Sequence, residues 1–247
     1  VLCTNLRMTH PIFSFAVNYG IEIVSDLQIF FDQVQGSKLI GITGTNGKST
    51  TISLIDFILE KQNLPIVATN TGKIHPLQLS EDMDGYIFDL EDHHLDLLKN
   101  FQSYISLLLN VEPGNLGKYS HYQEYSLTKE KIISLSNESF SIIGIDSLFA
   151  KNLYLKYRNY NTGNIIPVSG ERSVEGGVSC DGNAIYDNRF DMCRHGDINF
   201  SYAVIGKHNR QNVAAAYTIC KILNIDSKTI IERTAKFQGL PHRLQFV

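Results

Sequence analysis

One short string, GTNGKST at 44–50, limits what this chain can fold into. It follows an apolar run at 38–44 and precedes a helical pattern that carries Ile52, Ile55 and Ile58 on one stripe. A glycine-rich turn at the start of a helix exposes backbone N–H groups, and the helix dipole favours an anion there. The string therefore predicts a phosphate-binding loop, which consists of Gly44, Thr45, Asn46, Gly47, Lys48, Ser49 and Thr50.

Two side chains of this loop suit nucleotide chemistry. Lys48 would reach the outer phosphates, and the hydroxyl of Ser49 is placed to ligate Mg²⁺. The spacing departs from the common phosphate loop, because the glycine expected five residues before Gly47 is Ile42. A plain strand-to-helix turn is the alternative, but the order of strand, loop and helix favours a nucleotide site.

Apolar runs of strand length alternate with helical patterns along most of the chain. Such alternation implies a parallel sheet with right-handed crossovers. We therefore expect an α/β fold, with a P-loop-type, mostly parallel sheet flanked by helices. Further strands are expected at 64–69, 85–90, 103–111 and 139–145, with a helix at 122–135.

The later segments have other patterns. Short polar and apolar alternations, broken by Gly and Asn, predict a small antiparallel β subregion between Asn164 and Tyr202. A helix is expected at 209–223, and Asp226 can cap another that runs through Phe237.

Composition and charge exclude several classes of protein. The 22 basic and 25 acidic residues give a formal net charge of −3. The chain therefore has no excess of positive charge that would indicate binding to a nucleic acid or to an anionic membrane surface. No apolar run reaches the ~20 residues of a membrane-spanning helix. The cysteines show no CxxC pair, so we expect free thiols in a reducing cytoplasm; they are Cys3, Cys180, Cys193 and Cys220.

The length bears on domain organisation. At roughly 150 residues per domain, 247 residues suggest one large domain, or one and a half. The chain opens on Val1 and ends on Val247 directly after a charged motif, so we expect a piece of something longer. In residues 1–36 we expect a strand, a helix and a strand, with 12–17 and 20–24 on either side of a turn.

Three strings together resemble the motifs of one family. They are ITGTNGKST at 42–50, GKHNRQN at 206–212 and GLPHRL at 239–244. They resemble the Mur ligases, the ATP-dependent amide-bond ligases that build peptidoglycan precursors, and the third is most typical of the D-glutamate-adding member. The resemblance implies that Asn209 and Asn212 help to hold the adenine and that Arg243 contacts ATP.

The resemblance also implies an activity. It predicts a ligase that adds D-glutamate to UDP-N-acetylmuramoyl-L-alanine through an acyl phosphate, with ATP and Mg²⁺. It implies the end of a UDP-binding domain and a linker at 1–36, a central ATP-binding domain at 37–237, and a hinge at 238–247 to a third domain absent from this chain. We expect a monomer without nucleic-acid or membrane partners.

The family's catalytic residues carry over position by position. Asp89 matches the metal-binding glutamate, and Lys129 matches a lysine that CO₂ carbamylates into an anionic metal ligand. The resemblance thus implies Lys48, Asp89 and Lys129 as catalytic residues, and Ser49, Asp89 and carbamylated Lys129 as metal ligands. The turn after the strand at 64–69 matches the family's contact with the muramoyl substrate, and it contains Asn70, Thr71 and Gly72.

Two places depart from the family's pattern. The family has two aspartates and a metal-binding histidine where this chain has Gly114, Asn115 and Gly117. Asn115 offers only a neutral carbonyl oxygen, so a second metal site would be weaker. The two serines that usually follow the metal carboxylate and its neighbour are Glu91 and Asp92 here.

Two other functions stay open at this stage. The same scaffold carries folylpolyglutamate synthase-like amide ligases, although the GLPHR string speaks against them. A nucleotide-binding pseudoenzyme would keep the loop without catalysis, and the departures at 114–117 motivate that hypothesis. Measuring whether phosphate release depends on the amino acid and on the acceptor distinguishes the D-glutamate ligase from these two alternatives.

Two clusters resemble metal sites only in part. His93 and His94 are adjacent, and neighbouring positions on a helix lie about 100° apart, so a solvated, acidic helix start is the better interpretation of 91–96. Cys193 and His195 have no second pair nearby in the sequence, so we do not expect zinc there.

Overall fold

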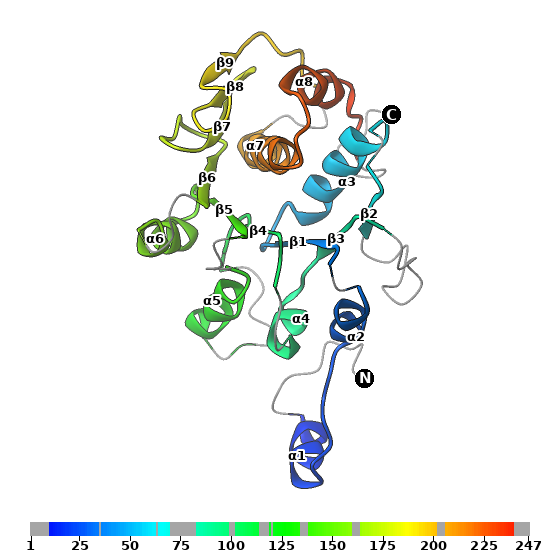
Figure 1. The fold of residues 1–247 in the computed structure, drawn as a ribbon. Helices are drawn as coiled ribbons and strands as arrows, with labels where there is room; N and C mark the ends of the chain where they lie inside the picture. The colour runs from blue at the N-terminus through cyan, green and yellow to red at the C-terminus, as the bar shows by residue number, and fades with distance from the viewer. Residues whose placement is uncertain are drawn as a thin grey trace.

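A single sheet organises the chain (Figure 1). The structure, a computed structural model, describes residues 10–34, 36–62, 64–69, 83–98, 102–113, 119, 121–133, 138–159, 164–201 and 206–239. Within these ranges the sheet has the order β2-β3-β1-β4-β5-β6-β7-β8-β9. The strands are β1 (Lys38–Thr43), β2 (Ile66–Thr69), β3 (Gly85–Asp89), β4 (Ile105–Leu108), β5 (Phe140–Gly144), β6 (Ile165–Ser169), β7 (Val178–Asp181), β8 (Ala184–Asp187) and β9 (Cys193–His195).

Helices cover both faces of this sheet. In Figure 1, α3, α7 and α8 lie on one face, whereas α2, α4, α5 and α6 lie on the other. The helices are α1 (Pro11–Asn18), α2 (Asp26–Gln33), α3 (Lys48–Leu59), α4 (Asp92–Leu97), α5 (Tyr122–Glu130), α6 (Leu148–Tyr157), α7 (Lys207–Ile222) and α8 (Ser227–Lys236). None of these helices is long and apolar enough to span a membrane, a finding limited to the described residues.

The strands run as the sequence predicted, with one exception. All neighbours from β2 to β7 are parallel, and β7, β8 and β9 pair antiparallel, which confirms the mostly parallel α/β fold. The antiparallel subregion is shorter than predicted, because β6 pairs in parallel with both β5 and β7. Every residue of β6 is buried, as is typical of a parallel strand covered on both faces.

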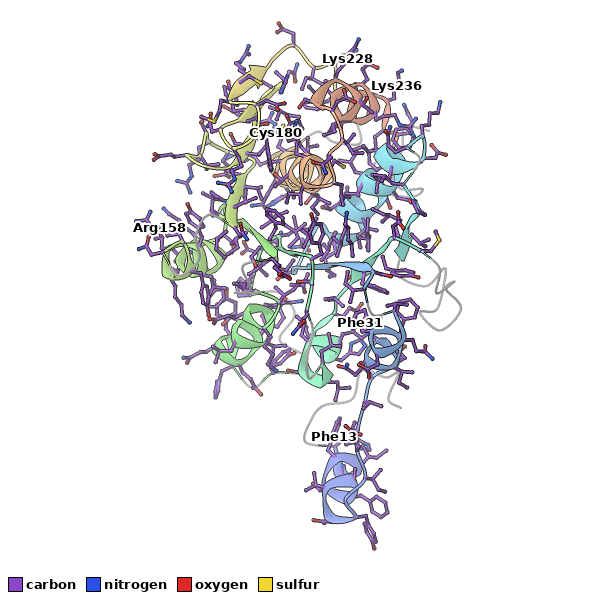
Figure 2. All side chains as sticks on the ribbon, in the orientation of Figure 1. Phe13, Phe31, Arg158, Cys180, Lys228 and Lys236 are labelled. Atoms are coloured by element: carbon purple, nitrogen blue, oxygen red, sulfur yellow. The ribbon has the colours of Figure 1, made fainter. Side chains whose placement is uncertain are left out.

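Side chains alternate between the two faces and build two apolar cores. On β3, Tyr86 and Phe88 join the core beneath α2, whereas Ile87 joins the core beneath α3 and α7. Phe31 of α2 packs edge-on against Phe88, with ring centroids 5.0 Å apart, and Figure 2 shows it between α2 and the sheet. The sheet is therefore held in place from both sides.

The N-terminal segment differs from the prediction. It forms the helices α1 and α2, so the strands expected at 12–17 and 20–24 were wrong. Pro11 occupies the first turn of α1, where its missing N–H is tolerated. Ser25 caps α2 by accepting the N–H of Gln28 at 3.0 Å. Helix α1 stands apart from the body of the domain (Figure 1).

The helix boundaries differ slightly from the expected ones. Helix α5 ends at Glu130, before the predicted end at 135, and α7 begins at Lys207, two residues earlier than expected. Asp226 caps α8 as predicted, since its carboxylate accepts the N–H of Thr229 at 2.9 Å. The earlier start of α7 places the GKHNRQN string within its first two turns.

Candidate active site

Three strands bring the candidate site together at one edge of the sheet. Strand β1 lies between β3 and β4 and runs parallel to both, so the carboxyl ends of all three meet there. The loop at 44–47 leaves β1 at this edge, Asp89 ends β3, and Asn110 follows β4. In open α/β sheets, ligands bind outside the carboxyl ends of the strands.

The loop enters α3 through Gly47, as the sequence predicted. Gly47 has a φ of 90°, in the left-handed region that favours glycine, and a Cβ atom there would overlap Oδ1 of Asn212. Asn212 is buried on α7, which runs beside α3 (Figure 1). The loop string and the GKHNRQN string, far apart in the sequence, therefore meet in space.

Asn110 holds the loop in position, and the sequence analysis missed it. Its Oδ1 accepts the N–H of Asn46 at 2.9 Å, and its Nδ2 donates to the carbonyl of the same residue at 3.0 Å. Its own carbonyl accepts the N–H of Thr45 at 3.1 Å. The available signal was a single asparagine at the end of an apolar run, which does not reveal its partner.

Thr45 ties the loop to two further segments. Its hydroxyl lies 2.8 Å from the hydroxyl of Tyr125 and accepts the N–H of Glu112 at 2.9 Å. Burial raises the pKa of Tyr125 to about 12, so its hydroxyl stays protonated and can donate to Thr45. Together, Thr45 and Asn110 tie the loop backbone to α5 and to the segment after β4.

Lys48 and Asp89 face each other beside the loop. Nζ of Lys48 donates to the carbonyl of Gly44 at 3.0 Å and lies 3.9 Å from Oδ1 of Asp89. Burial raises the pKa of the Asp89 carboxyl to about 6, and Lys48 opposes that shift. Oδ1 of Asp89 has no hydrogen-bond partner among the described residues. A buried carboxylate oxygen of this kind, next to the predicted phosphate-binding loop, fits a Mg²⁺ ligand.

Lys129 is buried behind the loop, where its side chain is 2% exposed. Its Nζ lies 2.5 Å from Oδ1 of Asp92 and donates to Oγ1 of Thr43 at 2.9 Å. Burial lowers the pKa of Lys129, and the carboxylate of Asp92 opposes that shift. The prediction of a solvated helix start at 91–96 is therefore wrong for Asp92, because α4 packs against α5 and turns this side chain toward Lys129.

The other predicted site residues have different outcomes. Ser49 and Thr50 are half-buried in the first turn of α3. Asn209 accepts a hydrogen bond from Nδ2 of Asn212 at 3.3 Å, so both lie on the part of α7 next to the loop; their contact with adenine stays a prediction. The rest lie outside the described residues: Asn70, Thr71, Gly72, Gly114, Asn115, Gly117 and Arg243.

One further cluster lies at the β9 edge of the sheet. Asp191, Cys193 and His195 place one possible ligand atom each within 4.8 Å of one another, a third group that the sequence spacing did not reveal. Nζ of Lys221 donates to both carboxylate oxygens of Asp191, at 2.9 and 3.0 Å, and Ser227 donates to one of them. Nε2 of His195 lies 3.2 Å from the hydroxyl of Tyr217, so the cluster belongs to a hydrogen-bond network that connects β9 with α7 and α8.

The comparison with protein families decides the classification. Residues 42–220 match the family model described as the Mur ligase middle domain. This chain belongs to the Mur ligase family. The match runs from β1 into α7 and includes the loop, Asp89, Lys129 and Asn212. Mur ligases depend on ATP, which agrees with a phosphate-binding loop at this position.

Curated relatives match along the whole chain. Proteins from Rickettsia felis and Rickettsia bellii, both named UDP-N-acetylmuramoylalanine--D-glutamate ligase, are 35% identical over 249 residues and match 100% of this chain. The match covers 54% and 55% of their own lengths, so the chain spans about half of each relative.

A solved structure shows the same fold. The UDP-N-acetylmuramate:L-alanyl-gamma-D-glutamyl-meso-diaminopimelate ligase from Neisseria meningitides superposes with a TM-score of 0.70 at 13% identity. The superposition covers 97% of this chain and 78% of that one. At this identity the similarity concerns the fold alone.

Proposed function

We propose that this chain contains the ATP-binding part of a ligase that adds D-glutamate to UDP-N-acetylmuramoyl-L-alanine through an acyl phosphate. The family and the names of the relatives that match the whole chain support this proposal. The proposed organisation is the end of a UDP-binding domain at 1–36, the ATP-binding domain at 37–237 and a hinge at 238–247. The enzyme would act as a monomer in the cytoplasm, without nucleic-acid partners.

The observation that carries the proposal is the pairing of Lys48 with the buried Asp89 beside the loop. The loop N–H groups and Lys48 would bind the outer phosphates and balance the charge that develops as the γ-phosphoryl group moves to the acceptor carboxylate. Ser49 and Asp89 would hold Mg²⁺, which when bound neutralises phosphate charge. Because Asn110 and Thr45 already fix the loop, its N–H groups would need little reorganisation.

The amine of D-glutamate would then attack the acyl phosphate, and phosphate would leave. The remaining assignments follow the family resemblance. Asn209 and Asn212 would contact the adenine, Arg243 would contact ATP, and Asn115 would offer a weak ligand to a second metal ion. The muramoyl substrate would meet the turn that contains Asn70, Thr71 and Gly72.

Phosphate release by the complete polypeptide that contains this chain tests the proposal. We expect release to require both UDP-N-acetylmuramoyl-L-alanine and D-glutamate, and L-glutamate to fail as a substitute. Lys48→Ala should lower kcat by about 100-fold or more, because it removes a fixed charge from the transition state. The matched control is Lys131→Ala, which removes an exposed lysine paired with Asp96 and should keep the wild-type rate. Unchanged turnover in Lys48→Ala would refute the loop assignment.

A nucleotide-binding pseudoenzyme is the second candidate. It is favoured by Gly114, Asn115 and Gly117, which replace three polar or ligating residues of the family's pattern. ATP binding by the complete polypeptide, together with no D-glutamate-dependent phosphate release, would establish this candidate and exclude the ligase.

A further inference from the structure

Three side chains of different chemistry meet beside β9, the last strand in the order of the sheet. Sγ of Cys193 lies 3.2 Å from Nε2 of His195, and a carboxylate oxygen of Asp191 lies within 4.8 Å of both. Five strands separate β9 from β1, which leads into the loop at 44–47. This β9 cluster of Asp191, Cys193 and His195 is therefore separate from the candidate active site, and its chemistry does not depend on the proposed function.

The donor atoms of the β9 cluster suit a transition-metal ion. Thiolate sulfur, imidazole nitrogen and carboxylate oxygen are the ligands that Zn²⁺ takes in proteins. A tetrahedral ion with bonds of about 2.0–2.3 Å needs ligand atoms about 3.4–3.6 Å apart. The separation of 3.2 Å between Sγ of Cys193 and Nε2 of His195 is close to this value. The side chain of Asp191 is 37% exposed, so it can turn to close the remaining separation.

Neighbouring groups support the ligands as they do in metal sites. Within the described residues, Oδ1 of Asp191 accepts a hydrogen bond from Lys221 only, so it keeps a lone pair for a cation. Oδ2 accepts hydrogen bonds from Lys221 and Ser227, and carboxylates that ligate metals are commonly hydrogen-bonded in this way. An ion at Nε2 of His195 would replace its contact with Tyr217, whose hydroxyl keeps Ser227 as a partner at 2.8 Å.

The charges around the β9 cluster favour a divalent ion. Asp187 is fully buried, and its carboxylate accepts the backbone N–H groups of the turn at 189–191. Asp187 and Asp191 carry two negative charges, and Lys221 contributes one positive charge against Asp191. A divalent ion bound by the thiolate of Cys193 adds one net positive charge, so these five groups balance. Buried charges are stable where they are paired or coordinate a metal.

We propose that Asp191, Cys193 and His195 bind a divalent transition-metal ion of the Zn²⁺ type and leave one coordination position open. Asp191 supplies the third ligand that the sequence spacing of Cys193 and His195 did not show. On binding, a bond forms between Sγ and the metal, the S–H bond breaks, and the proton passes to solvent. Through Lys221 and Ser227 the ion would tie β9 to α7 and α8, so its role is to hold this edge of the domain together.

Titration with Co²⁺ tests the site, because this ion takes the same nitrogen and sulfur ligands as Zn²⁺ and absorbs light. The protein is the complete polypeptide that contains this chain, freed of metal with a chelator. We expect a thiolate-to-metal charge-transfer band that Zn²⁺ removes. Cys193→Ser should lose the band, and His195→Gln should weaken Co²⁺ binding by about tenfold or more. Ser227→Ala, which removes only a support of Asp191, should keep the band and weaken binding by about tenfold.

The matched controls are Cys3→Ser, which removes another thiol of the sequence, and Asp197→Asn, which changes an exposed aspartate near β9. Both should bind Co²⁺ as the wild-type protein does. No charge-transfer band in the wild-type protein would overturn the proposal and leave the β9 cluster as a hydrogen-bond network only. A band that persists in folded Cys193→Ser, or unchanged Co²⁺ affinity in folded His195→Gln, would overturn it as well.

Discussion

Asp89→Asn offers a quantitative test of the electrostatics of the site. Burial raises the pKa of the Asp89 carboxyl from 3.8 to about 6. Between these values the folded chain binds a proton that the unfolded chain releases, so the free energy of unfolding falls as the pH rises through that interval. Above about pH 6 the carboxylate is ionised in both the folded and the unfolded chain. The whole cost of burying its charge then lowers the free energy of unfolding.

The size of this effect follows from the two pKa values. Their difference, at about 1.4 kcal/mol for each pH unit, corresponds to about 3 kcal/mol. The attraction of Lys48, 3.9 Å away, is already contained in this difference, because it opposes the rise of the Asp89 pKa. We therefore expect Asp89→Asn to be more stable than the wild-type chain by about 3 kcal/mol near pH 8, and about equally stable near pH 4.

Urea unfolding of both chains at the two pH values measures the difference. Millimolar Mg²⁺ should stabilise the wild-type chain near pH 8 and have no such effect on Asp89→Asn, because ligand binding to the folded state raises stability by mass action. Asp197→Asn, which changes an exposed aspartate, is the control and should behave as wild type. Equal stability of Asp89→Asn and wild type near pH 8, or equal stabilisation by Mg²⁺, would refute the reasoning.

Two further predictions concern the loop. Gly47→Ala forces a side chain into the left-handed region and against Asn212, so we expect ATP affinity to fall by about tenfold or more in a fluorescence titration. Wild-type affinity in this variant would contradict the prediction. Asn110→Ala removes two side-chain hydrogen bonds to Asn46, at about 1 kcal/mol each, so the KM for ATP should rise by up to about 30-fold. A KM within twofold of wild type would exclude that role for Asn110.

The elements that the sequence predicted well are those with local signals. Strand β1, the loop and the start of α3 each have their own pattern of apolar and glycine residues, and Asp226 marks the start of α8 by a capping rule that acts within one turn. The strands expected at 12–17 and 20–24 were wrong, because Pro11 and Ser25 favour helix starts over strands.

The contacts that the sequence missed join distant segments. Asn110 and Asn46 are 64 positions apart, and Lys129 and Thr43 are 86 apart, so neither pair leaves a periodic trace in the chain. Asp92 was predicted to face solvent because an acidic helix start is usually exposed, and only the packing of α4 against α5 shows that it faces Lys129. The resemblance predicts Lys48, Asp89 and Lys129 as site residues, but it did not predict how their charges pair.

The contact between Gly47 and Asn212 has a consequence for synthesis of the chain. The loop emerges early from the ribosome, but the residue packed against it belongs to α7, near the end of the domain. At ~5–20 residues per second, on the order of ten seconds separate the two. Arg233 of α8 donates a hydrogen bond to the carbonyl of Phe57 on α3, 176 positions earlier in the chain. This contact of the helix that follows the loop therefore forms later still. A nascent chain therefore holds its loop without the buried partner until α7 has docked, and tight nucleotide binding at the proposed site would report that the domain has folded.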